Sequence, residues 1–265
     1  MPKSIYQALA ELEAAGGAGV LCTLISARGS TPRRAASKML VYPDGRILGS
    51  VGGGELESRV IAAALEALQS GQSRLLDYRM SEPAEGDPGL CGGQVQVYVE
   101  PLNPRPVLLI VGAGHVGRAL AHLAKWLGFR VVISDDREEF CNPQAVPDAD
   151  EWLCLSPAEI ASAVELTPWT YIALTTRSVD VDVACLPAFL ASPVPYIGVI
   201  GSRRRWLTTR EKLLSAGVSE ELIARVRSPI GLELNAETPE EIAVSIMAEI
   251  LMLRGGGDGK PMSRE

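Results

Sequence analysis

Histidine is scarce in this sequence of 265 residues, and its cysteines lack paired spacings. Only two histidines occur, which disfavours a histidine-rich metal centre. The five cysteines are odd in number and scattered, without a Cys-x-x-Cys pair. This pattern is typical of reduced thiols in a cytoplasmic protein, and it argues against a disulfide framework and a structural zinc site.

Long apolar runs and an excess of positive charge are also missing. No apolar run is long enough to cross a bilayer, and the first residues have helical periodicity and acidic side chains, unlike a signal peptide, so we expect no membrane association. The 32 acidic and 25 basic residues give a formal net charge of −7. Duplex-DNA binders show the opposite balance, so we expect no nucleic-acid partner.

The basic residues that are present gather in two loops rich in glycine and serine. In chain order they are Arg28, Arg33, Arg34 and Lys38, followed by Arg203, Arg204, Arg205, Arg210 and Lys212. Such loops in an acidic protein indicate a small anionic ligand, with Arg33 and Arg203 as candidate contacts. Solvated surface arginines explain each cluster equally well.

A proline-rich connector, residues 101–106, divides the chain into two predicted domains, because three prolines in six residues interrupt helices and central strands alike. Residues 1–100 predict an α+β domain with a small mixed or antiparallel sheet. Residues 107–254 alternate strand and helix, as in a Rossmann-like, doubly wound parallel sheet. Residues 255–265 are predicted to form a disordered tail. The predicted fold class is therefore α/β.

The second domain opens with the strongest single motif, a Gly-x-Gly-x-x-Gly loop between the apolar run 107–111 and a helical pattern. Gly112 permits a tight turn, Gly114 lets a pyrophosphate approach the backbone, and Gly117 lets the helix pack on the strand. The start of the helix adds unpaired N–H groups and a partial positive charge. This loop therefore predicts a site for a phosphorylated cofactor.

Two side chains beside this loop are further candidates. Asp135 ends the next predicted strand, where it is placed to accept hydrogen bonds from ribose hydroxyls. His115 lies within the loop and is expected to line the phosphate site or to remain in solvent. The alternative is a Rossmann-like domain that has lost its ligand or binds a partner instead.

The first domain carries a second glycine loop and a glycine-flanked cysteine. Gly52, Gly53 and Gly54 precede a predicted helix, where consecutive N–H groups can converge on an anion; a plain strand-to-helix turn is the alternative. Cys91 stands in the sequence Gly-Leu-Cys-Gly-Gly, which leaves room around its thiol, whereas Cys22 lies inside an apolar strand pattern. An inert small residue is the alternative interpretation of Cys91.

Taken together, these motifs resemble the XdhC/CoxI family of accessory proteins of xanthine dehydrogenase and related molybdenum hydroxylases. The matching stretches are GSTPRRAASKMLV (29–41), GSVGGGELE (49–57), LCGGQVQVYVEPL (90–102), VGAGHVGRALA (111–121), ISDDREEF (133–140), YIGVIGSRRR (196–205) and SPIGLELNAETPEEIAVSIMAEI (228–250). They follow one another in the family's order and cover nearly the whole chain.

The resemblance implies a protein that binds molybdenum cofactor (molybdopterin, in some cases extended by a nucleotide), protects it during sulfuration and delivers it to an apo-dehydrogenase. A cysteine desulfurase would donate the sulfur, and the protein would associate with itself. Cys91 becomes the candidate contact for molybdenum or sulfur. Some family members carry a cysteine after the triple glycine, where this chain has Glu55, which favours the xanthine dehydrogenase side of the family.

We interpret the chain as a cofactor-insertion factor without turnover of its own, so no catalytic residue is predicted. The alternative is an NAD(P)-dependent oxidoreductase, but no Tyr-x-x-x-Lys pair supplies a proton-transfer group. A nucleotide-sensing module ranks third, because it leaves the Cys91 loop unexplained.

Overall fold

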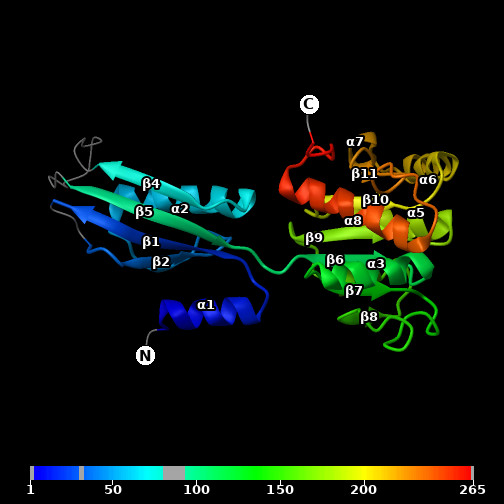
Figure 1. The fold of residues 1–265 in the computed structure, drawn as a ribbon, viewed down its shortest axis with the longest axis horizontal. Coiled ribbons are helices and arrows are strands. Elements are labelled where there is room, and N and C mark those ends of the chain that lie inside the picture. Colours follow the sequence, from blue (N-terminus) through cyan, green and yellow to red (C-terminus); the bar gives the residue numbers. More distant parts are fainter. Residues whose placement is uncertain (1–2, 30–32, 80–92, 264–265) are drawn as a thin grey trace. The chain divides into compact units, whose positions relative to one another are not determined.

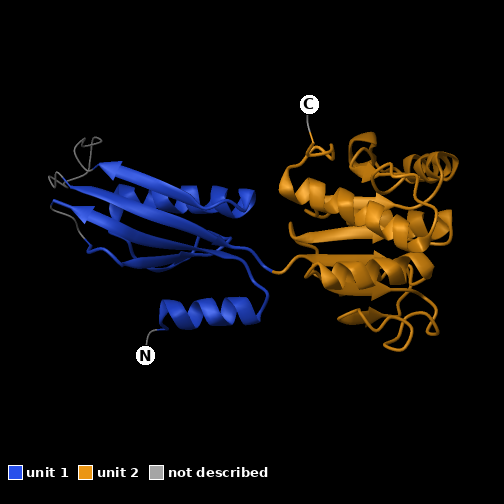
Figure 2. Cartoon of the chain, in the orientation of Figure 1, with its two compact units in different colours: residues 1–104 blue, residues 105–265 orange. Residues whose placement is uncertain are grey.

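The computed structural model describes residues 3–29, 33–79 and 93–263 of the chain. Its internal contacts divide the chain into two compact units, Met1–Pro104 and Arg105–Glu265 (Figure 2). The division falls inside the proline-rich segment 101–106. Each unit contains its own sheet and its own helices (Figure 1).

The first unit contains a five-stranded antiparallel sheet in the order β3-β2-β1-β5-β4. Its elements are α1 (Ile5–Ala14), β1 (Gly19–Arg28), β2 (Lys38–Val41), β3 (Ile47–Gly49), α2 (Gly54–Ser70), β4 (Arg74–Arg79) and β5 (Gln94–Leu102). Helix α2 contacts β5 and β1, and alternate residues of β5, Val95, Val97 and Val99, are fully buried. The core of this unit therefore lies between α2 and the two central strands.

Strand β5 corrects the start of the predicted connector. It continues to Leu102 and includes Pro101, which lies opposite Val20 of β1. On its other side β4 reaches only to the partner of Val99, so β5 is an edge strand from that point on. Proline is tolerated on an edge strand, because the missing N–H faces no ladder partner there.

The second unit is built on a six-stranded sheet in which every pairing is parallel. Its strands are β6 (Val107–Val111), β7 (Arg130–Ser134), β8 (Glu151–Leu153), β9 (Thr170–Leu174), β10 (Tyr196–Val199) and β11 (Val226–Arg227). The spatial order β11-β10-β9-β6-β7-β8 is the order of a doubly wound dinucleotide-binding fold. The predicted fold class is thereby confirmed.

Helices cover both faces of this sheet. Helices α3 (His115–Trp126) and α8 (Pro239–Gly255) share one core with alternate strand residues such as Leu108 and Ile110 of β6. The neighbouring residues Leu109 and Val111 point to the second core, which contains residues of α4 (Ile160–Ala163), α5 (Val179–Leu190), α6 (Arg203–Ser215) and α7 (Glu220–Ile223). Burial on both faces explains the uninterrupted apolar run of β6.

The last helix, α8, docks inside its own unit. Thr238 and Glu241 form a capping box at its start, with Pro239 in the first helical position. Ile246 and Ile250 are fully buried, and α8 packs against α3. The helix includes Gly255, and the residues after it that the structure describes, 256–263, form no helix or strand. Disorder of the tail stays a prediction.

Candidate functional site

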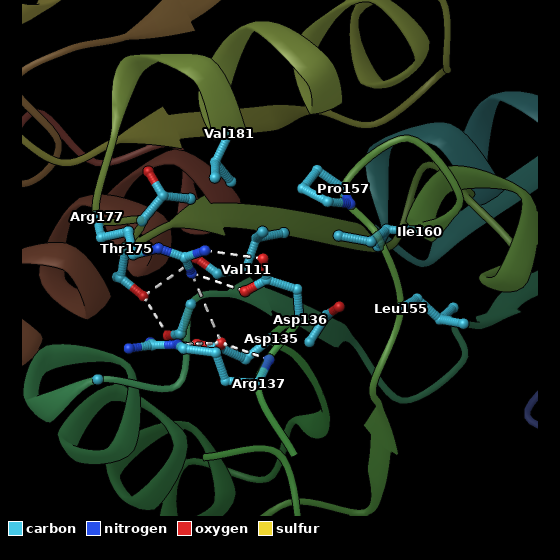
Figure 3. A pocket seen from close by; sticks show the side chains of 14 residues that line it. Val111, Asp135, Asp136, Arg137, Leu155, Pro157, Ile160, Thr175, Arg177 and Val181 are labelled. Atoms are coloured by element: carbon cyan, nitrogen blue, oxygen red, sulfur yellow. Dashed lines mark hydrogen bonds and ion pairs between the residues drawn. The ribbon is translucent and has the colours of Figure 1, made fainter. Parts of the chain in front are cut away.

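The carboxyl ends of β6, β7 and β9 meet at the topological switch point of the second sheet, between β6 and β9. Chain connections leave these two neighbouring strands in opposite directions, which opens a crevice where doubly wound sheets bind ligands. A pocket lies at this place (Figure 3). It is lined by Val111, Gly112, Gly114, Ser134, Asp135, Asp136, Arg137, Leu155, Pro157, Ile160, Thr175, Thr176, Arg177 and Val181.

The three glycines of the loop meet three different requirements. A Cβ on Gly112, whose φ is +108°, would lie 2.6 Å from the carbonyl oxygen of Thr175. A Cβ on Gly117 would lie 2.0 Å from the carbonyl oxygen of Gly112, so both positions require glycine for close backbone packing. A Cβ on Gly114 would meet nothing within 4 Å. Gly114 is therefore the position where the backbone of the loop is open toward the pocket.

The start of α3 offers donors beside this opening. Gly114 is the N-cap residue and has no side chain to bond the first turn. Within the part of the chain that the structure describes, no backbone acceptor is assigned to the N–H groups of Gly114, His115 and Val116. Unpaired N–H groups at a helix start attract anions, because the helix dipole adds a partial positive charge. The loop thus has the donor set of a phosphate site.

Asp135 is buried at the end of β7 and is held by donors of the protein itself. Its Oδ2 accepts from the Ala113 N–H at 2.9 Å and from Nη2 of Arg137 at 2.9 Å. Its Oδ1 accepts from Nε of Arg137 at 2.8 Å and from the Arg137 N–H at 3.2 Å. Burial raises the pKa of Asp135, but these donors outweigh it and hold the pKa below its ordinary value. The aspartate is therefore ionised, and it ties the glycine loop to β7.

A second ion pair lines the solvent-exposed side of the pocket, its mouth, with side chains that are 48% and 33% exposed. Arg177, after β9, donates from both terminal nitrogens to Asp136, after β7, at 2.7 and 2.8 Å (Figure 3). The pairing lowers the pKa of Asp136 to about 2. The Arg137 guanidinium lies 3.9 Å from the centre of the Phe140 ring, which fixes the plane of its charge. Sequence analysis did not predict a role for Arg137 or Arg177. The one available sequence signal was the Asp-Asp-Arg run after the strand, which includes Arg137.

His115 is exposed at the start of α3 and does not line this pocket. It lies instead in a shallow groove between α3 and α8, together with His122 and Val244. His122 pairs there with Asp148 at 3.0 Å, so this imidazole–carboxylate pair supplies no proton-transfer group to the switch-point pocket. Of the two expected places for His115, the structure supports the solvent-exposed one.

Most of the second basic cluster is engaged in ion pairs. Arg205 binds the buried Asp182 through Nη2 at 2.7 Å and Nε at 3.2 Å. Two further members of the cluster form ion pairs, Arg210 with Glu220 and Lys212 with Asp180. Arg203 is exposed in the first turn of α6 and remains a candidate contact for an anion.

The triple-glycine loop of the first unit surrounds a carboxylate of its own chain. Oε1 of Glu57 accepts from the hydroxyl of Ser50 at 2.5 Å and from the N–H groups of Val51 and Gly52 at 3.1 and 3.3 Å. Burial raises the pKa of Glu57, but these donors and the Gly53 N–H lower it by more. Its pKa therefore lies below the ordinary value. The loop does gather N–H groups around an anion, and in this structure that anion is Glu57.

The other glycines and candidates of this unit have distinct positions. Gly52, Gly53 and Gly54 all have positive φ values, which explains three consecutive glycines by backbone conformation. Arg33 is exposed in the segment between β1 and β2. Cys91 lies outside the described residues. Among the described residues, no group of three or more His, Cys, Asp or Glu side chains is placed to hold a metal ion.

The fold and the switch-point pocket define the second unit as a Rossmann-type domain with a pocket at the carboxyl ends of its strands. Comparison with known families gives the same assignment. The XdhC Rossmann domain profile matches residues 108–250, and the XdhC and CoxI family profile matches residues 12–79. The chain belongs to the XdhC and CoxI family, as its motifs predict.

Three curated relatives extend this assignment. The chain is 35% identical over 263 residues to the uncharacterized protein YqeB of Escherichia coli (strain K12), covering 98% of this chain and 48% of YqeB. It is 32% identical over 158 residues to a protein of Bacillus subtilis (strain 168) named as a probable subunit of xanthine dehydrogenase, covering 60% and 46%. It is 25% identical over 288 residues to the molybdenum cofactor insertion chaperone PaoD of Escherichia coli (strain K12), covering 95% and 88%. The chain thus spans about half the length of the first two relatives.

A solved structure supports the fold. A crystal structure described as a xanthine dehydrogenase from Bacillus halodurans is 24% identical, with a TM-score of 0.52, and the match covers 99% of this chain and 98% of that one. At this identity the likeness bears on the fold alone. No helix in the described part of the chain combines the length and apolarity needed to cross a membrane.

Proposed function

We propose that this protein binds molybdenum cofactor and acts as an accessory protein that holds the cofactor for sulfuration and delivers it to xanthine dehydrogenase or a related molybdenum hydroxylase. Membership of the XdhC and CoxI family carries the proposal. The name of PaoD, a molybdenum cofactor insertion chaperone, supports it. A cysteine desulfurase as sulfur donor and self-association of the protein belong to the same proposal.

The switch-point pocket fits the phosphate end of such a cofactor. The N–H groups at the start of α3 and the guanidinium groups of Arg137 and Arg177 together form a cationic surface around Gly114. Leu155, Pro157, Ile160 and Val181 supply an apolar wall of the same pocket. When bound, the cofactor would supply the molybdenum and the pterin dithiolene, while this chain binds and shields.

The pocket volume constrains how the ligand enters. Its volume is about 100 Å³, whereas sites for small-molecule ligands occupy ~300–1,000 Å³. The Arg177–Asp136 pair lies across the mouth. A pterin or nucleotide therefore requires this pair to open, while a phosphate group alone fits the existing space.

The first test of the proposal is what the protein carries. After anaerobic co-expression with the molybdenum-cofactor pathway, we expect about one pterin and one molybdenum per chain, measured by fluorescence of the oxidised pterin and by elemental analysis. DNA binding in the same preparation should be undetectable at physiological salt, because the chain is acidic. A folded protein that carries neither pterin nor molybdenum contradicts the proposal.

The second test concerns Cys91. In a strain that lacks the native protein, we expect Cys91→Ser to leave dehydrogenase subunits assembled but without sulfurated cofactor, because a thiolate is a good ligand for molybdenum and a good acceptor of sulfur and a hydroxyl is neither. Sulfuration is measured as the cyanide-releasable sulfur of the purified dehydrogenase.

Cys154→Ser is the matched control for this substitution. Cys154 is exposed, and partial desolvation and neighbouring acidic side chains raise its pKa, which disfavours the thiolate. Cys22 is a poorer control, since it is buried in β1, where burial raises its pKa to about 12. Full dehydrogenase activity with Cys91→Ser removes this thiol from the mechanism and leaves cofactor binding to phosphate and pterin contacts.

An NAD(P)-dependent oxidoreductase is the second candidate, because the pocket lies where dinucleotides bind in this fold. None of the residues that line the pocket is a histidine, tyrosine or lysine. Hydride transfer to a carbonyl needs a proton-transfer group within hydrogen-bond reach of the substrate. Turnover of reduced nicotinamide cofactor with small carbonyl substrates would favour this candidate over the accessory role.

A further inference from the structure

The environment of Asp135 determines what its subsite can bind. A carboxylate has about four lone-pair acceptor positions. Four hydrogen bonds from Ala113 and Arg137 already use them, and the side chain is only 2% exposed. An aspartate at this place in a doubly wound sheet binds a ribose diol when its oxygens face the crevice. Here no acceptor position is left for a ribose hydroxyl.

Guanidinium donors face the pocket instead. The Arg137 side chain is 34% exposed and the Arg177 side chain 48% exposed, and both residues line the pocket. A guanidinium has five N–H donors, of which Asp135 and Asp136 each engage a part. The two cations come from different strand ends, after β7 and after β9, and both lie beside Asp135 and Asp136 (Figure 3). The two guanidinium groups are thus far more accessible than Asp135, and the one exposed carboxylate beside them, Asp136 at 33%, is paired with Arg177.

We propose that this subsite takes a phosphate monoester rather than a ribose diol. The proposal rests on the pocket being the ligand site of the proposed function. A dianionic phosphate monoester can accept two parallel hydrogen bonds from one guanidinium, and a second arginine nearby strengthens the binding. Arg177 exchanges Asp136 for the phosphate, which opens the mouth of the pocket as the ligand binds. The monoester can belong to a ribose or to the side chain of a pterin that carries no nucleotide.

The direct probe is a pair of isomeric nucleotides that differ in the position of one phosphate, adenosine 2′,5′-bisphosphate (2′,5′-ADP) and adenosine 5′-diphosphate (5′-ADP), each titrated calorimetrically into the full chain at low salt. We expect 2′,5′-ADP to bind about tenfold more tightly, the effect of one additional hydrogen bond to a charged group. Equal affinity, tighter binding of 5′-ADP, or no binding of either nucleotide to folded protein overturns the proposal.

Three substitutions assign the effect to the arginines. Arg137→Gln should erase the preference for 2′,5′-ADP. Arg177→Gln should reduce it severalfold, while Ala113 and Arg137 keep their four hydrogen bonds to Asp135. Asp136→Asn should tighten 2′,5′-ADP binding severalfold, because Arg177 then no longer has to leave a carboxylate. The matched control is Arg130→Gln, an exposed arginine paired with Glu151 at the amino end of β7, which should change neither affinity. An unchanged preference in both arginine variants overturns the assignment.

The source of the monoester is resolved on protein purified with bound pterin. Release of the pterin by 2′,5′-ADP but not by 5′-ADP shows that one subsite serves both monoesters. If pterin and molybdenum co-purify while the two nucleotides bind equally, the proposed function stands and this inference fails. If the nucleotide preference is found on a protein that never carries pterin, the inference stands and the proposed function fails.

Discussion

Substitution of Gly114 by valine is expected to abolish ligand binding in the switch-point pocket while the protein stays folded. Gly114 has φ −71° and ψ −168°, a conformation open to residues with a side chain, and its Cβ would meet nothing within 4 Å. The valine side chain would therefore occupy the space over the first turn of α3, where a phosphate must come within hydrogen-bond distance. Losing two charge-assisted hydrogen bonds costs about 3 kcal/mol or more, which corresponds to a fall in affinity of roughly 100-fold.

The control for this substitution is Gly117→Ala, further along the same loop-helix segment. Its expected effect is on the stability of the fold, whereas that of Gly114→Val is on ligand binding. A Cβ on Gly117 would lie 2.0 Å from the carbonyl oxygen of Gly112 and 3.0 Å from Oγ1 of Thr175. We expect it to lower the unfolding free energy by about 1–3 kcal/mol, since overpacking against backbone forces the loop to move. Both variants are measured by urea unfolding and by pterin content. Normal pterin content in Gly114→Val assigns the loop a structural role and moves the ligand to the first unit.

The second large effect is expected from Arg205→Met, which should destabilise the second unit by about 3–5 kcal/mol. Asp182 is fully buried, and Arg205 is its cationic partner. Thr176 also donates its hydroxyl to Asp182, and Arg205 donates to the carbonyl oxygen of Thr176 at 3.0 Å. Without Arg205, the aspartate is a buried charge without a counter-ion. Urea unfolding of the purified chain measures the loss.

The double variant Arg205→Met, Asp182→Leu separates charge from packing. Replacing both members of a buried ion pair with apolar residues is often nearly neutral, so we expect the double variant to recover roughly half or more of the lost stability. A double variant as unstable as the single one would show that the hydrogen bonds of Arg205 to backbone carbonyls, and not the burial of Asp182, dominate its contribution.

The same variant has a defined pH dependence. Burial raises the pKa of Asp182 in the native chain, and Thr176 and Arg205 oppose that rise. In Arg205→Met the folded pKa rises further, so the native state binds a proton that the unfolded state releases near pH ~4. Stability then falls as pH rises above that value. We expect the deficit relative to wild type to be larger at about pH 8 than at about pH 5, as measured by urea midpoints at both values.

Local sequence signals were sufficient to predict the fold class, the glycine loop of the pocket and the position of Asp135. The apolar run of β6 and the glycines that follow it act over a few residues, and the structure has the strand and the helix that they predict. The two-residue strand β11 was not predicted, because so short a strand carries no periodicity. The position of Asp135 at the end of β7 also followed from sequence, since a strand fixes where its last residue lies.

What Asp135 does was decided by tertiary structure. The sequence placed it for ribose, but the fold surrounds it with Ala113 and Arg137. Arg205 belonged to an apparent ligand-binding cluster, and the fold places it on Asp182, which lies 23 residues away in the chain. The sequence predicted no role for the Glu57 side chain, yet its carboxylate accepts hydrogen bonds from the N–H groups of the triple-glycine loop.

The amino-acid sequence by itself determined the class of fold, the family and the glycine loop of the switch-point pocket, because helix and strand periodicity, glycine conformation and short motifs are properties of neighbouring residues. Only the tertiary structure decided which charges reach the pocket. Arg177 and Asp136 are 41 residues apart, and they meet because the sheet order sets β9 beside β6 and β6 beside β7. Such pairings between distant residues decide whether a charged side chain can bind a ligand or is already paired within the protein, and no local sequence pattern encodes them.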